Sequence, residues 1–295
     1  MLSVASTEGK APKVRKQSEM TAVARRLSQN SSAVIGFVVA TILVLMAIFA
    51  PLIAPYPYDK QNLLDSRQAP SGEHIFGTDE LGRDIFSRVV YGSRYSLSIG
   101  FLAVLFSSGI GMLLGAMAGY FGGVVDDIIM RLIDVIQSIP HILLAISISV
   151  VLGPGFFNTL LALGFGMITM ACRLTRASVL GVRNEEYLEA ATSINAGTGR
   201  IIFRHVLPNS FSPLLVSASM SIGNVIMAAA MLSFIGLGVQ PPLPEWGSMI
   251  AGGRSLIRSC PWMVTFPGIF IMLTVLSLNM FGDGLRDALD PKLKK

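Results

Sequence analysis

The sequence predicts an all-α integral membrane protein with six transmembrane helices. Three observations lead to this fold class: 52% of the 295 residues are hydrophobic, only 14% are charged, and the apolar residues are gathered in long uncharged runs. Soluble domains usually carry about 25% charged residues, so a soluble fold of this composition would lack the polar side chains that cover a water-facing surface. Lipid is therefore expected to cover part of the molecule.

The spans are located by their apolar runs, because about 20 apolar residues in a helix cross the roughly 30 Å of hydrocarbon in a bilayer. These runs are 33–54, 95–125, 135–172, about 212–237, and 259–282. The run 135–172 is long enough for two helices, and Gly153-Pro154-Gly155 near its middle is a turn signal. This run is therefore divided into a third and a fourth span, which gives six in total.

Lys and Arg residues are distributed unevenly between the two sides of this topology. With the N-terminus inside, sixteen of the 23 basic residues fall on the inner side and seven on the outer side. Cytoplasmic segments carry such an excess, so both termini are expected in the cytoplasm, as a basic tail of residues 1–32 and a short tail of residues 283–295. The outer side then holds segments 55–95 and 239–258, and a core of five helices occupies 96–282.

Small residues and charges in the predicted spans indicate contacts between helices. Three glycines of the second span stand at four-residue spacing: Gly111, Gly115 and Gly119. Such a face lets another backbone approach closely, and packing within the chain is favoured over a subunit interface. At the inner end of the third span, Arg131 is expected to pair with Asp127 and Asp134, which lie four and three residues away on the same helix face.

The two outer segments are also expected to lie at the membrane surface. Leu81, Ile85 and Val89 share one helix face, so a short amphipathic helix is predicted there. The stretch from Trp246 to Ile257 is predicted to dip back toward the membrane, with the Trp246 ring at headgroup depth. A packing role and contact with a substrate-delivery protein are both open for these segments.

The largest inner loop contains two short helical segments. Residues 185–194 are strong helix formers, and Gly197 and Gly199 interrupt them. Residues 201–206 are compatible with a second short helix, which Pro208 would end. On the residue pattern alone, a partner-docking loop and an interfacial hairpin are equally open.

The same loop resembles the Glu-Ala-Ala loop of permease subunits of ABC importers. The residues that match this pattern are Glu189, Ala190, Ala191, Leu207 and Pro208. His205 stands where the family has Ile, and Asn195 stands where it has Gly. The resemblance implies that residues 178–209 form a coupling loop seated in a cleft of an ATPase subunit. The residues expected to contribute to it are Glu185, Glu189, Ala190, Ala191, Ile194, Asn195, Gly197, Arg204, His205, Leu207 and Pro208.

Four further stretches resemble the dipeptide, oligopeptide and nickel branch of this family, in particular its C-type inner-membrane subunit. They are Phe76–Asp84, Leu232–Pro242, Pro244–Gly247 and Gly282–Pro291. The resemblance implies the fold of a type I ABC-importer permease in a bacterial or archaeal inner membrane. The implied partners are a second homologous permease, two ABC ATPase subunits, an extracytoplasmic substrate-binding protein and the lipid bilayer.

The chain has no Gly-x-x-x-x-Gly-Lys-[Ser/Thr] motif to cradle a phosphate, so a non-catalytic subunit without a cofactor is expected, with ATP and Mg²⁺ in the partner subunits. A stand-alone secondary carrier would be expected to show an ionisable residue within the membrane or matched broken helices. Metallohydrolase and serine-hydrolase motifs are also missing from the sequence, and no nucleic-acid-binding motif accompanies the basic tail.

The resemblance favours di- and oligopeptides as the transported substrate, with a nickel chelate or glutathione-like cargo as alternatives. Within the fifth span, Asn224, Met227 and Met231 form one helical stripe, and Met220 precedes them. These four residues are the candidates for the translocation pathway. A methionine stripe is also common in packed cores, so core packing is the competing interpretation.

Overall fold

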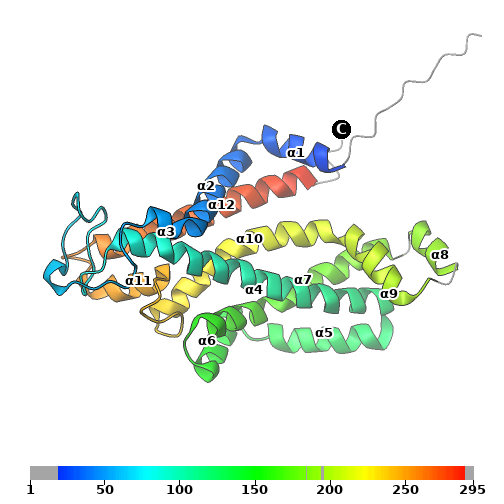
Figure 1. Ribbon diagram of the computed structural model, residues 1–295. Coiled ribbons are helices and arrows are strands. Elements are labelled where there is room, and N and C mark those ends of the chain that lie inside the picture. The colour runs from blue at the N-terminus through cyan, green and yellow to red at the C-terminus, as the bar shows by residue number, and fades with distance from the viewer. Residues whose placement is uncertain (1–18, 184, 194–195, 290–295) are drawn as a thin grey trace, which may run out of the picture.

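The computed structural model describes residues 19–183, 185–193 and 196–289, which form an elongated bundle of helices (Figure 1). Apart from one isolated bridge between Thr78 and Asp84, these residues contain no β-structure. The helices are α1 (Glu19–Gln29), α2 (Ser31–Ile48), α3 (Ala50–Ile53), η1 (Leu63–Asp65), α4 (Ile85–Phe121), α5 (Gly123–Gln137), α6 (His141–Leu152), α7 (Phe156–Val182), α8 (Glu186–Ser193), α9 (Thr198–Ile201), the π-helical turn η2 (Ile202–Val206), α10 (Leu207–Phe234), α11 (Trp246–Gly253), η3 (Arg254–Leu256) and α12 (Trp262–Leu289).

Five of these helices are long and apolar enough to cross a membrane: α2, α4, α7, α10 and α12. Taken together, α5 and α6 are also long and apolar enough for a sixth span, but the two halves are bent by 83° across residues 138–140. Pro140 accounts for the break, because proline lacks the N–H of a continuing helix and pushes the preceding residue out of helical conformation. The predicted all-α fold with six spans is confirmed, with a broken third span in place of a straight one.

Helix α4 begins at Ile85, well before the start at residue 95 that hydropathy predicts. The short surface helix expected around Leu81 and Val89 is therefore wrong: Val89 belongs to the first turns of α4 and is fully buried. Asp84 starts the helix by accepting the backbone N–H of Ser87 at 2.7 Å. With 37 residues, α4 is about 55 Å long, so it extends beyond the hydrocarbon of the bilayer.

The glycine face of α4 packs against α7 within the same chain, as predicted. An added Cβ at Gly115 would collide with the carbonyl oxygen of Cys172, and one at Gly119 would lie 2.9 Å from the Cβ of Val179. Helices α4 and α7 also form the most extensive helix pair in the described part of the molecule. Small residues therefore let the two central helices approach to backbone contact.

Ion pairs join α5 to α7, and they differ from the predicted pairing. Both oxygens of Asp126 accept hydrogen bonds from Arg176 at 2.6 Å, and Asp134 pairs with Arg173. The predicted clamp by Arg131 is wrong, because no ion pair among the described residues includes it. Helix α5 lies close enough to α7 for arginines from that neighbouring helix to reach its acids.

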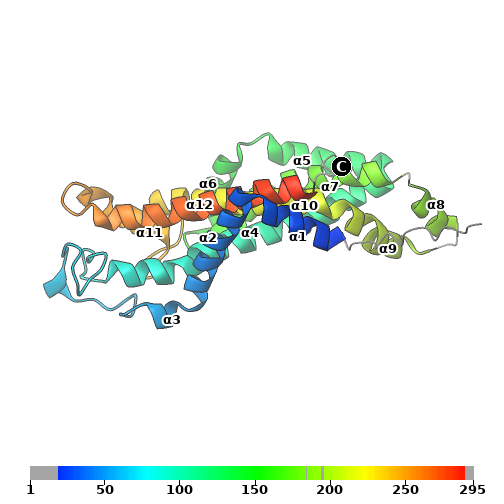
Figure 2. The same ribbon diagram turned by 90° about the horizontal axis from the view of Figure 1, so that it is seen from above.

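The predicted inner and outer segments lie at opposite ends of the bundle. Segment 54–84 and helix α11 occupy one end, and α8 and α9 occupy the other, in both views (Figures 1 and 2). Helix α1 runs beside the C-terminal half of α12, where Arg26 donates a hydrogen bond to the carbonyl of Ala288 at 3.4 Å. The described residues nearest the two termini therefore lie in the half of the molecule that holds the predicted coupling loop.

Candidate functional site

The predicted coupling loop is a helical hairpin built from α8, α9 and η2. It is held to the ends of α4 and α7 by one apolar cluster. The cluster consists of Leu188, Ile201, Ile202, Val206 and Leu207 from the hairpin with Ala116 of α4 and Val179 of α7. All of these side chains are less than 9% exposed. The hairpin is therefore packed firmly onto the spans rather than attached by its two ends alone.

The second arm of the hairpin runs without interruption into α10. The backbone N–H of Leu207 bonds to the carbonyl of Ile202, which makes the turn before it π-helical. Pro208 therefore lies in the first turn of α10 and does not end the segment, contrary to prediction. The π-helical turn lies just before this proline, which lacks the N–H that a continuing α-helix would use. The hairpin and the span α10 therefore share one continuous helical stretch from Thr198 to Phe234.

The predicted contact residues divide between the two faces of the hairpin. Leu207 is 7% exposed and belongs to the apolar cluster, so it is not available to a partner. Glu185, Gly197, Arg204 and Pro208 are exposed, whereas His205 is half-buried.

The structure adds two exposed aromatic side chains that were not among the predicted contact residues, Tyr187 at 40% and Phe203 at 64%. Glu189, Ala190 and Ala191 lie within α8, and Ile194 and Asn195 lie outside the described residues.

The predicted pathway residues lie on α10. Asn224, Met227 and Met231 are exposed on one stripe, with Met227 and Met231 about half exposed in this chain. Met220 differs, because it is half-buried and its side chain lies over Gly282 of α12. The stripe is therefore uncovered by the described residues of this chain, and Met220 serves packing between α10 and α12.

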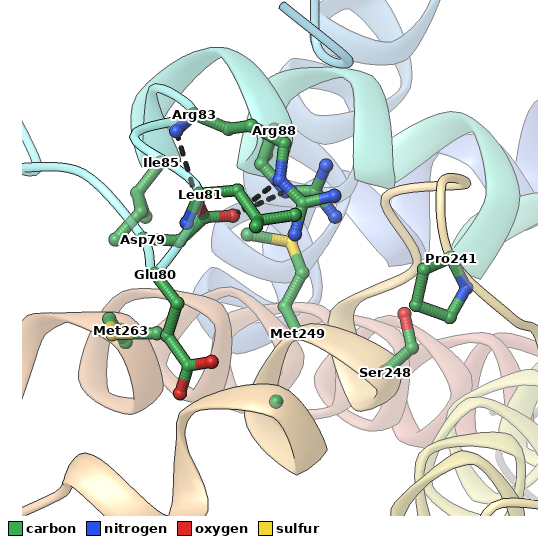
Figure 3. A pocket seen from close by; sticks show the side chains of 11 residues that line it. Asp79, Glu80, Leu81, Arg83, Ile85, Arg88, Pro241, Ser248, Met249 and Met263 are labelled. Atoms are coloured by element: carbon green, nitrogen blue, oxygen red, sulfur yellow. Dashed lines mark hydrogen bonds and ion pairs between the residues drawn. The ribbon is translucent and has the colours of Figure 1, made fainter. Parts of the chain in front are cut away.

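At the opposite end, three side chains form a buried cluster that we call the outer clasp: Asp79, Arg83 and Arg88. Asp79 accepts the backbone N–H groups of Leu81 and Arg83 and the side-chain Nε of Arg83 at 2.7 Å. Arg88, at the start of α4, is 3% exposed; its Nε lies 3.7 Å from Asp79, and its Nη1 donates to the carbonyl of Tyr58 at 2.9 Å. The clasp lines a cavity of about 190 Å³ (Figure 3).

Helix α11 completes this end of the molecule. Glu245 begins it by accepting the backbone N–H groups of Gly247 and Ser248, each at 2.8 Å. Burial raises the pKa of the Glu245 carboxyl above its ordinary value of 4.5, against the opposing effect of those hydrogen bonds. Trp246 is fully buried and its indole N–H bonds to the carbonyl of Val89 at 2.9 Å, so the ring is enclosed by protein, and its headgroup depth stays a prediction.

Residues 111–295 match the family described as the inner membrane component of binding-protein-dependent transport systems. The chain belongs to this family of permeases. Residues 18–70 of the permease match a second family, the N-terminal transmembrane domain of oligopeptide transport permease C. Members are non-catalytic, multi-pass inner-membrane subunits of ABC importers, and so is this permease. Membership implies ATPase and substrate-binding partners.

Two relatives and one solved structure are similar to the permease over most of their own length. It is 48% identical over 270 residues to a dipeptide transport system permease of Alkalihalophilus pseudofirmus, covering 92% of this chain and 89% of that protein. It is 44% identical to a glutathione transport system permease of Pectobacterium atrosepticum, covering 92% and 90%. An inward-facing structure of the MetNI methionine ABC transporter has a TM-score of 0.55 at 17% identity, covering 70% of this chain and 98% of that one, which shows the shared fold.

Proposed function

We propose that this permease imports di- and oligopeptides, as one half of the translocation pathway of an ATP-driven importer. The observation that carries the proposal is the 48% identity to a dipeptide permease over nearly the whole chain, together with the match of its N-terminal part to an oligopeptide permease domain. The other half of the pathway comes from a second, homologous permease. Two ATPase subunits, with ATP and Mg²⁺, supply the energy, and an extracytoplasmic binding protein delivers the peptide.

The hairpin of α8, α9 and η2 is the proposed coupling element. Its apolar cluster fixes it to α4 and α7, and its uncovered face presents Tyr187 and Phe203. Exposed aromatic side chains on a rigid support are favourable anchors for a partner pocket. Because η2 continues into α10, ATPase movement at the hairpin would tilt α10 and with it the stripe of Asn224, Met227 and Met231.

That stripe is the proposed wall of the pathway. A side-chain amide within a span has no hydrogen-bonding partner in lipid, so Asn224 is better placed facing the second permease or the water of the pathway. The methionines beside it are flexible and polarizable, and such side chains adapt to ligands of varied shape. A pathway that accepts many peptide side chains needs such adaptability. Alternating access then follows from the tilt of α10 against its neighbours.

The docking face is tested by Phe203→Asp in the importer purified from its native membranes. We expect the variant to retain its membrane insertion and to lose co-purifying ATPase subunits and ATP-dependent uptake of a labelled dipeptide. Leu64→Asp is the matched control, because Leu64 is 93% exposed at the opposite end of the molecule. It should retain the ATPase subunits. If the full amount of ATPase subunits co-purified with Phe203→Asp, the docking surface would lie elsewhere.

Glutathione-like cargo is the second candidate substrate, favoured by the 44% identity to a glutathione permease. Competition separates the two in the reconstituted importer. If peptides are the substrate, excess unlabelled dipeptide should abolish uptake of the labelled dipeptide while excess glutathione leaves it nearly unchanged. Uptake of labelled glutathione that dipeptides do not inhibit would contradict peptide transport and leave the coupling proposal standing.

A further inference from the structure

Arg94 of α4 lies at the end of the first span. Its Nε donates to the carbonyl of Ala47 at 2.6 Å, and its Nη2 donates to the carbonyl of Ile48 at 2.8 Å. The last carbonyls of a helix lack helical partners, so the guanidinium completes the C-terminus of α2. The guanidinium carbon also lies 5.7 Å from the centroid of the Tyr91 ring, within the range of a cation–π contact.

These two bonds leave most of the guanidinium unused. An arginine carries five N–H donors, so about three remain after the two carbonyls are served. No ion pair among the described residues includes Arg94, so no carboxylate neutralises its charge. Arginine presents these donors in a planar fork that matches the oxygens of a phosphate. The side chain is thus an unneutralised cation with free donors suited to an anion.

The same guanidinium borders an apolar groove between α2 and α4. The groove is shallow and open to the outside, with a volume of about 570 Å³. Apart from Arg94 and Ser98, it is lined by apolar side chains, namely Val44, Ala47, Ile48, Leu97, Phe101 and Leu102. Both helices are apolar spans, so the groove lies along the membrane-spanning part of the molecule.

The order of the lining residues along the two helices gives the groove a polar end and an apolar end. Leu97 and Phe101 follow Arg94 by one and two turns of α4, and Val44 precedes Ile48 by one turn of α2. All three lie farther from the end of α2 than the guanidinium does. Arg94 lies beside the C-terminal end of α2, and the groove runs from it along the membrane-spanning parts of α2 and α4.

We propose that this groove is a binding site for one anionic phospholipid. The phosphate accepts hydrogen bonds from the free N–H groups of Arg94, and an acyl chain lies along Leu97, Phe101 and Val44. The uncompensated charge of Arg94 favours a lipid of net negative charge, such as phosphatidylglycerol, over a zwitterionic one. Free inorganic phosphate would satisfy the arginine but leave the apolar groove unfilled. The bound lipid would strengthen the contact of α2 with α4.

The test is photo-crosslinking of the tagged permease, purified with the subunits that accompany it and reconstituted in phosphatidylcholine nanodiscs. The probe is phosphatidylglycerol with a diazirine on its acyl chain, and the matched probe is phosphatidylcholine with the same chain. We expect phosphatidylglycerol to label the peptides that carry Val44 and Phe101 several-fold more than phosphatidylcholine does. Excess inorganic phosphate should not compete. Equal labelling by the two probes, or no labelling of these peptides, would overturn the proposal.

Two variants separate lipid binding from the structural role of Arg94. Ser98→Trp fills the groove and leaves Arg94 and its two carbonyl bonds in place, so it should remove the preferential labelling without loss of folded protein. Arg94→Gln should reduce it as well. Ser98→Ala and Arg254→Gln are the controls, since Arg254 is exposed and lies over Phe234 away from the groove; both should label as the wild type does. Preferential labelling that survives Ser98→Trp would show that the lipid binds elsewhere.

Discussion

Arg176 of α7 holds Asp126 of α5 in a bidentate ion pair, with Nε–Oδ1 and Nη2–Oδ2 distances of 2.6 Å each. The two side chains are only 31% and 16% exposed. A pair of parallel charge-assisted hydrogen bonds fixes geometry as well as charge. Helix α5 is separated from α6 by the break at residues 138–140 and is bent away from it. This ion pair is therefore a main determinant of the position of α5 against α7.

We expect Asp126→Ala to destabilise the permease by about 1–3 kcal/mol, because Arg176 is left partly buried without its partner. Asp134→Ala is the matched control on the same helix, since its pair with Arg173 is about half exposed. Exposed pairs contribute at most about 1 kcal/mol. Thermal unfolding of the detergent-purified variants measures both effects. A larger loss from Asp134→Ala than from Asp126→Ala would contradict this ranking.

The contact between α4 and α7 is tested by adding a single methyl group. In Gly115→Ala the new Cβ meets the backbone carbonyl of Cys172, so the helices must separate, at a cost of about 1–3 kcal/mol. Gly109 lies on the same helix with nothing within 4 Å of an added Cβ. Gly109→Ala should therefore be neutral, or stabilising by up to about 1 kcal/mol through helix propensity. Yields of monodisperse protein and melting temperatures of the two variants give the comparison.

Local signals of the sequence predicted the spans and the hairpin between the third and fourth helices correctly. Gly153 and Gly155 do have positive φ and mark that turn. The predicted clamp at Arg131 failed because spacing along one helix cannot show that Arg173, far along the chain, reaches Asp134 first.

The start of α4 was misplaced for a related reason. Arg88 and Arg94 indicate the end of an apolar span, but each donates a hydrogen bond to a backbone carbonyl, of Tyr58 and Ala47 respectively, and the helix continues. The hydropathy of a sequence does not report such contacts between distant segments.

The turn of the coupling hairpin leads to a prediction about Asn195, Gly197 and Gly199. The family's Gly at position 195 suggests a residue with positive φ in this turn, a conformation open to Asn195 or to one of the following glycines, and Asn195 lies outside the described residues. Gly197 has φ −59° and ψ 140°, and Gly199 lies in α9, so neither is left-handed. With nothing within 4 Å of an added Cβ, Gly197→Val and Gly199→Val should preserve coupled transport. Asn195→Val remains the variant expected to impair it, as measured by uptake and ATPase activity.

Glu245 predicts a pH dependence of stability. Because burial raises its pKa in the folded state above 4.5, the folded protein holds this proton more tightly than the unfolded chain does. Its contribution is therefore fully present below about pH 4.5 and is lost as the pH rises through the folded-state pKa. Glu245→Gln cannot titrate and lacks this dependence. The stability of the wild type relative to the variant should fall from acidic to neutral pH, and a rise in that difference would contradict the assignment.

Arg88 of the outer clasp predicts how the outer end is held together. Its Nη1 donates to the carbonyls of Tyr58 and Pro242, at 2.9 and 3.5 Å, so one side chain of α4 joins two segments far apart in the sequence. In Arg88→Met the carbonyls lose a buried donor, and each such loss costs about 1–3 kcal/mol. Segment 54–84 should then be cleaved faster by added protease in nanodiscs.

Arg83→Met is the matched control for this prediction. It removes one bond to Asp79, but that carboxylate keeps the backbone N–H groups of Leu81 and residue 83, which the substitution does not change. Its cleavage rate should therefore stay closer to that of the wild type. Arg88→Lys should behave like Arg88→Met, because a single ammonium lacks the fork that reaches two carbonyls and a carboxylate. Equal cleavage of the Arg83 and Arg88 variants would show that Asp79, and not the link to Tyr58 and Pro242, holds the segment in place.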